Sequence, residues 1–205
     1  GTTVRSDSII KVRIKEHDWV SRGGIKLDYA LKYFNIDVAN QTCIDIGSST
    51  GGFTDVLLHR RAKKVFCVDV GYGQLAWKIR NDERVIVFEK FNAKKIALSH
   101  IGTKVDVLVC DVSFISIKKI IPICLEILNR DAILIILIKP QFEVGREKIC
   151  KGGIVKDPKI HNAICDEIKV WFEDILNKRV IGVVESPIKG QKGNKEFLVA
   201  VINKS

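Results

Sequence analysis

Charged residues that could do chemistry stand where buried strands are expected to end. Asp69 follows the apolar run 65–68, Asp111 follows a similar run, and Lys139 follows seven apolar residues at 132–138. Ligands of an open parallel sheet gather beyond the carboxyl ends of its strands. We therefore expect Asp111 and Lys139 to project an acid and a lysine into one crevice. A buried lysine is costly unless it is paired, and such a lysine can serve as a base or as an anchor for an anion.

A glycine-rich run, Asp-Ile-Gly-Ser-Ser-Thr-Gly-Gly-Phe-Thr at 45–54, has the composition of a nucleotide-binding loop. It stands between a strand pattern and a helix pattern, and its glycines allow a ligand to approach the backbone closely. The spacing G-x-x-x-G-G differs from the G-x-G-x-x-G of dinucleotide binders, which disfavours NAD. Asp45 would suit the ammonium group of S-adenosylmethionine, and Asp69 would suit its ribose diol. The alternative is a tight turn with a solvated acid.

These residues need a sheet with crossover helices to position them. Strand and helix patterns alternate along most of the chain, which predicts an α/β fold of the Rossmann-like type: a mostly parallel seven-stranded sheet with an antiparallel C-terminal hairpin at its edge. An amphipathic helix at 25–34 would carry Lys26 in its first turn. The strands are expected at 42–46, 64–69, 85–88, 105–110, 132–138, 179–185 and 196–203, and the later helices at 52–61, 74–80, 116–128 and 157–176.

The chain of 205 residues is basic, with 34 lysines and arginines against 24 acids and a net charge of +10. Such a balance suits a polyanionic partner, although a lysine-rich surface could have no partner. Basic residues gather among glycines at 146–159 and 189–195, and loops of this kind are the expected contact surfaces. Charge alone leaves both alternatives open.

The six cysteines form no C-x-x-C pair, and we expect reduced thiols and no metal site. The four histidines, at 17, 59, 100 and 161, show neither metal nor triad spacing and are expected at the surface. No signal peptide or membrane-spanning run occurs, which favours a cytoplasmic protein without membrane insertion. Because the chain has no methionine, we expect it to begin inside a longer protein, with residues 1–20 as a linker remnant that holds a weak strand pattern at 10–14.

Ordered motifs from about residue 17 onward resemble the TlyA (haemolysin A) family of FtsJ-like RNA methyltransferases. They begin with V-S-R-G-G-I-K-L at 20–27 and the glycine-rich run, and continue with D-V-G-Y-G-Q-L-A-W-K at 69–78, D-V-S-F-I-S at 111–116, I-K-P-Q-F-E at 138–143, K-G-G-I-V at 151–155 and G-N-K-E-F at 193–197. The resemblance implies S-adenosylmethionine as cofactor, ribose 2'-hydroxyls of ribosomal RNA as substrate, and a catalytic domain at 21–205. The family's preceding S4-like RNA-binding domain is absent from this sequence. Its Arg-x-Trp-Val linker motif reads His-Asp-Trp-Val at 17–20.

The resemblance also assigns roles to single residues. A Lys-Asp-Lys-Glu tetrad falls on Lys26, Asp111, Lys139 and Glu196. We expect Asp111 and Glu196 to tune the protonation of Lys139, which orients and deprotonates the ribose hydroxyl. Lys26 is expected to hold the hydroxyl oxygen or an adjacent phosphate. The expected cofactor contacts are Asp45, Gly47, Ser48, Ser49, Thr50, Gly51, Gly52, Phe53, Asp69, Val70, Asn92 and Asp111.

Two functions of other classes remain open at this stage. One is a membrane-active haemolysin, and the other is an RNA-binding ribosome-assembly factor with weak or no catalysis. The lack of a strongly apolar amphipathic helix weighs against the first, and the complete tetrad weighs against the second.

Overall fold

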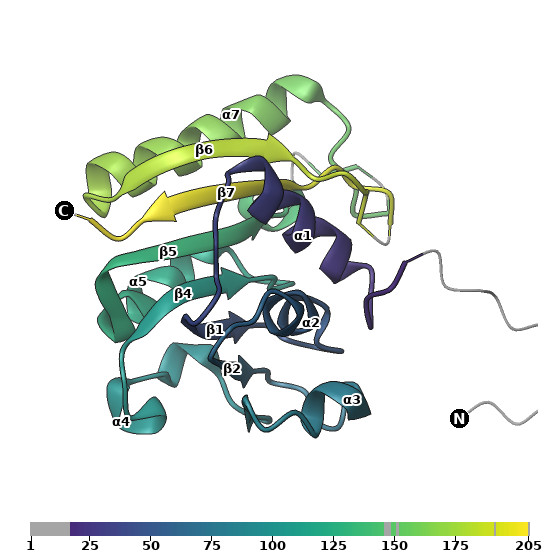
Figure 1. The fold of residues 1–205 in the computed structure, drawn as a ribbon. Coiled ribbons are helices and arrows are strands. Elements are labelled where there is room, and N and C mark those ends of the chain that lie inside the picture. Colours follow the sequence, from purple (N-terminus) through teal and green to yellow (C-terminus); the bar gives the residue numbers. More distant parts are fainter. Residues whose placement is uncertain (1–16, 146–148, 151, 191, 205) are drawn as a thin grey trace, which may run out of the picture.

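A computed structural model describes residues 17–145, 149–150, 152–190 and 192–204. Its centre is a seven-stranded sheet of order β3-β2-β1-β4-β5-β7-β6 (Figure 1). All neighbours among the first five strands are parallel, while β7 runs antiparallel to both β5 and β6. The predicted sheet with its antiparallel C-terminal hairpin is confirmed. The strands are β1 (Thr42–Ile46), β2 (Lys64–Val68), β3 (Val85–Phe88), β4 (Val105–Cys110), β5 (Leu128–Ile138), β6 (Arg179–Glu185) and β7 (Phe197–Ile202).

Helices cover both faces of the sheet, because successive strand residues point to opposite sides. In β1, Cys43 belongs to the apolar cluster under α1 (Gly23–Tyr33), α2 (Gly52–His59) and α3 (Trp77–Arg80). Its neighbour Ile44 belongs to the other cluster, under α4 (Leu98–Ile101), α5 (Ile121–Cys124) and α7 (Pro158–Val170). The central strands are buried on both sides, as their continuous apolar runs predict.

Some predicted helices are shorter than expected. The stretch 116–128 holds two 3₁₀ turns, Ile117–Lys119 and Leu125–Ile127, on either side of α5. Pro122 stands in the first turn of α5, where proline is tolerated. In the interior of a helix that began at 116 it would lack one hydrogen bond, and its ring would clash with the carbonyl group four residues earlier. The following strand begins at Leu128 rather than at 132. The predicted helix at 74–80 is reduced to the four residues of α3, and α7 ends in a π-helical turn at Trp171–Ile175.

The cysteines are free thiols, as predicted, and all except Cys150 are buried. The expectation of surface histidines is wrong for His161, which is 4% exposed. Its ring Nε2 lies 2.9 Å from the carbonyl oxygen of Val155, so burial leaves that nitrogen with a partner. Within the described residues, no helix is long and apolar enough to cross a membrane. The strand pattern expected at 10–14 lies outside the described residues.

Candidate active site

The topology brings four charged residues to one edge of the sheet. Asp111 directly follows β4, and Lys139 directly follows β5. Because β7 is antiparallel, its first residue pairs with the last residue of β5, so Glu196 arrives at this edge from the opposite direction. Lys26 stands in the first turn of α1 and is buried. Residues from three strand ends and one helix therefore meet at this edge of the sheet.

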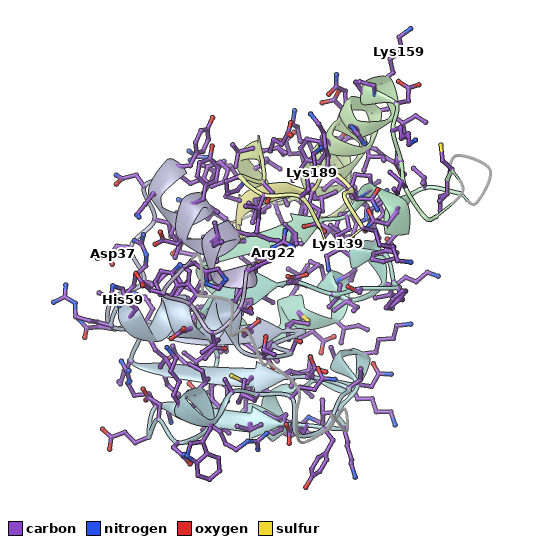
Figure 2. The ribbon with its side chains drawn as sticks, turned by 90° about the vertical axis from the view of Figure 1, so that its right-hand side faces the viewer. Arg22, Asp37, His59, Lys139, Lys159 and Lys189 are labelled. Atoms are coloured by element: carbon purple, nitrogen blue, oxygen red, sulfur yellow. The ribbon has the colours of Figure 1, made fainter. Side chains whose placement is uncertain are left out.

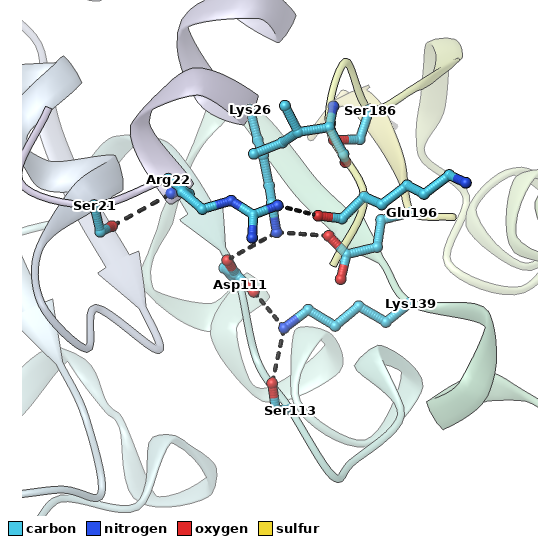
Figure 3. A network of polar contacts seen from close by, with 11 residues as sticks. Ser21, Arg22, Lys26, Asp111, Ser113, Lys139, Ser186 and Glu196 are labelled. Carbon is cyan, nitrogen blue, oxygen red and sulfur yellow. Dashed lines mark hydrogen bonds and ion pairs between the residues drawn. The ribbon is translucent and has the colours of Figure 1, made fainter. Parts of the chain in front are cut away.

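These four residues form a chain of alternating charge (Figure 3). The Nζ atom of Lys26 donates to Oε2 of Glu196 at 2.5 Å and lies 4.0 Å from Oδ2 of Asp111. The Nζ atom of Lys139 lies 2.5 Å from Oδ1 of Asp111 and donates to Oγ of Ser113 at 2.8 Å. Both lysines are 8% exposed and Glu196 is 4% exposed. Two carboxylates and two ammonium groups keep the tetrad neutral overall, which reduces the free-energy cost of burying it.

This geometry corrects one expectation. Glu196 was expected to tune Lys139, but its ion pair is with Lys26, and the acid that contacts Lys139 is Asp111. Ser113 is a site residue that the sequence prediction did not include. The feature of the sequence that could have indicated Ser113 is its position two residues after Asp111, in the motif at 111–116. The site therefore consists of two lysine–acid pairs, joined through Asp111.

The loop between β6 and β7 closes one side of the site. Gly190 leaves so little room that a Cβ atom there would lie 2.4 Å from Oε1 of Glu196. The Arg22 guanidinium donates to the carbonyl oxygen of Lys189 at 2.6 Å and ties this loop to the start of α1. Figure 2 shows Arg22, Lys139 and Lys189 on the same side of the molecule. Arg22 and Lys189, from two separate segments, thus lie beside the tetrad (Figure 2).

The glycine-rich loop packs directly against the tetrad. Gly47 has φ +83°, and a Cβ atom there would lie 2.5 Å from the carbonyl oxygen of Asp111. The amides of Gly47 and Ser48 donate to the carbonyl of Val68 at 2.8 and 3.3 Å, which fixes the loop above β2. Gly51, with φ +91°, turns the chain into α2. Only glycine meets the demand for positive φ and close approach at position 47.

Asp45 lies beneath this loop and is fully buried. Its Oδ2 accepts hydrogen bonds from the amide of Thr54 at 3.1 Å and from the Thr54 hydroxyl at 2.7 Å. Its Oδ1 is buried and has no hydrogen-bond partner among the described residues. Burial raises the pKa of this carboxyl to about 7, although the Thr54 hydrogen bonds act in the opposite direction. A buried oxygen without a partner is costly, and a cationic group would be a suitable partner.

Asp69 holds the outer part of the loop. Its Oδ2 accepts from the amide of Ser49 at 2.8 Å, and its Oδ1 accepts from the amide of Gly71 at 2.7 Å. Each oxygen keeps further acceptor capacity that a ribose hydroxyl could use. Val70 beside it is 71% exposed. The structure therefore brings Asp69 and Val70 to the open end of β2.

The other expected contacts divide into two groups. Thr50 and Asn92 are exposed, and Asn92 accepts from the amide of Lys94. Gly52 and Phe53 instead pack against α1: a Cβ atom at Gly52 would lie 2.2 Å from Oγ of Ser21, and Phe53 is 3% exposed in the core. The side chain of Phe53 therefore has a packing role, and the backbone at the start of α2 is the part left for a ligand.

The sheet order, the glycine-rich loop after β1 and the charged residues at the strand ends define the class of Rossmann-like methyltransferases. The chain belongs to the FtsJ-like methyltransferase family, whose family model matches residues 19–202. This match includes the glycine-rich loop and all four residues of the tetrad.

Curated relatives and a solved structure agree with this family. The 16S/23S rRNA (cytidine-2'-O)-methyltransferase TlyA of Mycobacterium tuberculosis is 45% identical over 184 residues, which are 90% of this chain and 68% of the relative. Hemolysin A of Brachyspira hyodysenteriae is 47% identical over 190 residues, 90% of this chain and 77% of the relative. A crystal structure of a Lactococcus lactis protein that carries the hemolysin name superposes with a TM-score of 0.87, at 48% identity, and covers 91% of this chain and 89% of that one.

Proposed function

We propose that this protein transfers a methyl group from S-adenosylmethionine to a ribose 2'-hydroxyl of ribosomal RNA. The observation that carries the proposal is the paired tetrad, Lys139–Asp111–Lys26–Glu196, beside the glycine-rich loop. A relative at 45% identity is named as an rRNA (cytidine-2'-O)-methyltransferase, which supports both the reaction and the substrate class.

The residues around the loop fit S-adenosylmethionine, which when bound supplies an activated methyl group. The unpartnered Oδ1 of Asp45 suits the cofactor's ammonium group. Asp69 stands where it can accept hydrogen bonds from the ribose diol. Gly47 lets the loop pack against the backbone of Asp111, which brings the loop close to the tetrad. These assignments make the loop and the two acids the binding part of the site.

The tetrad would activate and align the nucleophile, the ribose 2'-hydroxyl. A ribose hydroxyl is a poor nucleophile until it loses its proton, so a base in hydrogen-bond reach accelerates transfer. Lys139 is the candidate base: Asp111 and Ser113 orient its Nζ atom, and in its neutral amine form that nitrogen would take up the proton that the hydroxyl loses. Lys26 holds the attacking oxygen or a neighbouring phosphate, and Glu196 keeps Lys26 in place. Much of the catalytic work in this scheme is alignment of the hydroxyl.

The RNA would reach the tetrad across the surrounding basic side chains. Arg22 and Lys189 meet at one rim of the site, exposed Lys156 precedes α7, and exposed Lys159 stands in its first turn. Lysine and arginine side chains on such a surface bind phosphates independently of sequence and release counterions. Binding of this kind weakens steeply as the salt concentration rises.

The proposal is tested by titrating the protein with S-adenosylmethionine in a calorimeter, and then by supplying ribosomal subunits with radiolabelled cofactor. We expect saturable one-to-one binding and label in ribose 2'-O-methylnucleosides after digestion of the RNA. Lys104→Ala, at an exposed position, is the matched control for lysine substitutions in the site. Cofactor binding without transfer to any subunit would favour the assembly-factor function, and label on a base would overturn the 2'-O assignment.

A further inference from the structure

Asn194 joins the segment that precedes β7 to a second loop, distant in the sequence. It is 4% exposed, and both ends of its side chain are used. Its Oδ1 accepts from the amide of Val155 at 3.0 Å, and its Nδ2 donates to the carbonyl of Gly153 at 2.9 Å. Its own carbonyl accepts from the amide of Gly190 at 2.9 Å. One buried side chain therefore fastens residues 153–155 to the loop between β6 and β7.

Glu196 follows Asn194 by two residues, and groups connected to Asn194 lie on both sides of it. The main-chain carbonyl of Asn194 accepts from the amide of Gly190, and Gly190 lies so close to the Glu196 carboxylate that an added Cβ atom would clash with it. On the other side, the His161 ring lies 5.7 Å from the ring of Phe197, the residue after Glu196, and also contacts the carbonyl of Val155. The position of the carboxylate is thus set by groups on both sides of it.

We propose that Asn194 is a positioning residue that acts through Glu196: its side chain fastens the residues just before β7 to residues 153–155, so that the carboxylate meets Lys26. The inference rests on the proposed methyl transfer. Asn194 is assigned no contact with the substrate. Losing its side chain would release residues 153–155 from the segment that precedes β7 and leave Glu196 with fewer constraints, so that its ion pair with Lys26 is held less firmly. The hydrogen bond from the Gly190 amide uses the main chain of Asn194 and would remain. A small misplacement of a catalytic group can reduce the rate by about 100-fold.

The test compares Asn194→Ala with Asn203→Ala. Asn203 is a matched control because it lies just beyond the other end of β7, is 8% exposed, and donates through its Nδ2 to the carbonyl of Asn129 at 2.9 Å. We expect Asn194→Ala to lower kcat about 10- to 100-fold with unchanged affinity for S-adenosylmethionine. Asn203→Ala should lose stability but keep kcat. Equal kcat in the two variants would overturn the inference.

A double variant separates positioning from a general loss of structure. If Asn194 acts through Glu196, Asn194→Ala should reduce kcat much less in a Glu196→Gln background than in the parent, because the two losses share one cause. If kcat of the double variant falls by the product of the two single reductions, the two residues act independently and the inference is contradicted.

An activity-independent measurement distinguishes failure of this inference from failure of the proposed function. Hydrogen exchange of the segment 152–156 should accelerate in Asn194→Ala, because the Val155 amide loses its acceptor, and should stay as in the parent in Asn203→Ala. If the parent shows no methyl transfer, the proposed function fails, but this exchange result still reports on the fastening. Unchanged exchange in Asn194→Ala would contradict the inference by itself.

Discussion

Lys26 and Glu196 are 170 positions apart in the sequence, and their side chains form a buried ion pair of 2.5 Å. The pair joins the first helix to the last strand across the open end of the sheet. Asp111 lies 4.0 Å from Lys26 and continues the charge pattern toward Lys139. Removing one member therefore changes the charge balance of the whole tetrad.

Lys26→Met is expected to destabilise the fold by about 3 kcal/mol, because it leaves the Glu196 carboxylate buried without its cation. Adding Glu196→Gln removes the unpaired charge and should recover most of that loss. Methyl transfer should stay low in both variants, since Lys26 is gone. Chemical denaturation and a transfer assay measure the two effects separately. A double variant that is less stable than Lys26→Met would show that the ion pair is not the reason for the loss.

Lys139→Ala is expected to lower the rate of transfer by roughly 100-fold or more, because it removes the candidate base. Affinity for S-adenosylmethionine should change little, since the lysine contacts Asp111 and Ser113 rather than the glycine-rich loop. Single-turnover kinetics and calorimetry measure rate and affinity, and Lys104→Ala should leave both unchanged. Turnover by Lys139→Ala equal to that of the parent would remove Lys139 from the mechanism.

The positions of Asp111 and Lys139 could be predicted from the sequence because each follows an uninterrupted apolar run. Such a run identifies a strand buried on both faces, and the first charged residue after it marks the carboxyl end. The break in the helix at 116–128 was also present in the sequence, as Pro122. In both cases the information is local, although the apolar pattern at 116–128 predicted one unbroken helix and was wrong there.

The pairing of Lys26 with Glu196 could not be predicted from local patterns. It depends on β7 lying antiparallel beside β5, which brings the start of β7 to the carboxyl end of the sheet. The burial of Asn194 and His161 could not be predicted from local patterns either, because polar residues are expected at the surface. Each is buried because the fold supplies backbone partners from residues 153–155, which lie elsewhere in the chain.

Asp45 should make the stability of the fold depend on pH. Its pKa is raised by burial from 3.8 to about 7, so the folded chain binds this proton more tightly than the unfolded chain does. Its contribution is fully present below about pH 4 and is lost as the pH rises through 7. A shift of about 3 units at ~1.4 kcal/mol each gives a loss of about 4 kcal/mol. Asp45→Asn should remove this dependence, so unfolding curves of variant and parent should diverge toward pH 8.

The same carboxyl should affect cofactor binding. The charged form of Asp45 suits an ammonium partner, so affinity for S-adenosylmethionine should rise from about pH 5.5 to 7.5 in the parent. Asp45→Asn should bind more weakly and with little pH dependence over this range. A calorimetric series measures this, and an unchanged affinity in the variant would exclude Asp45 from the cofactor site.

Gly47→Ala should impair both the loop and the tetrad, because Gly47 is where they touch. A methyl group there faces the carbonyl oxygen of Asp111 at 2.5 Å and must also adopt φ +83°. The positive φ alone costs about 1 kcal/mol, and the backbone shift adds roughly 1–3 kcal/mol. Gly102→Ala is the control, since Gly102 has φ +71° with nothing within 4 Å of an added Cβ atom. We expect the control to lose only the smaller amount of stability and to bind S-adenosylmethionine normally, while Gly47→Ala binds it at least 10-fold more weakly. Equal affinity in the two variants would mean that the close approach of Gly47 to Asp111 does not shape the cofactor site.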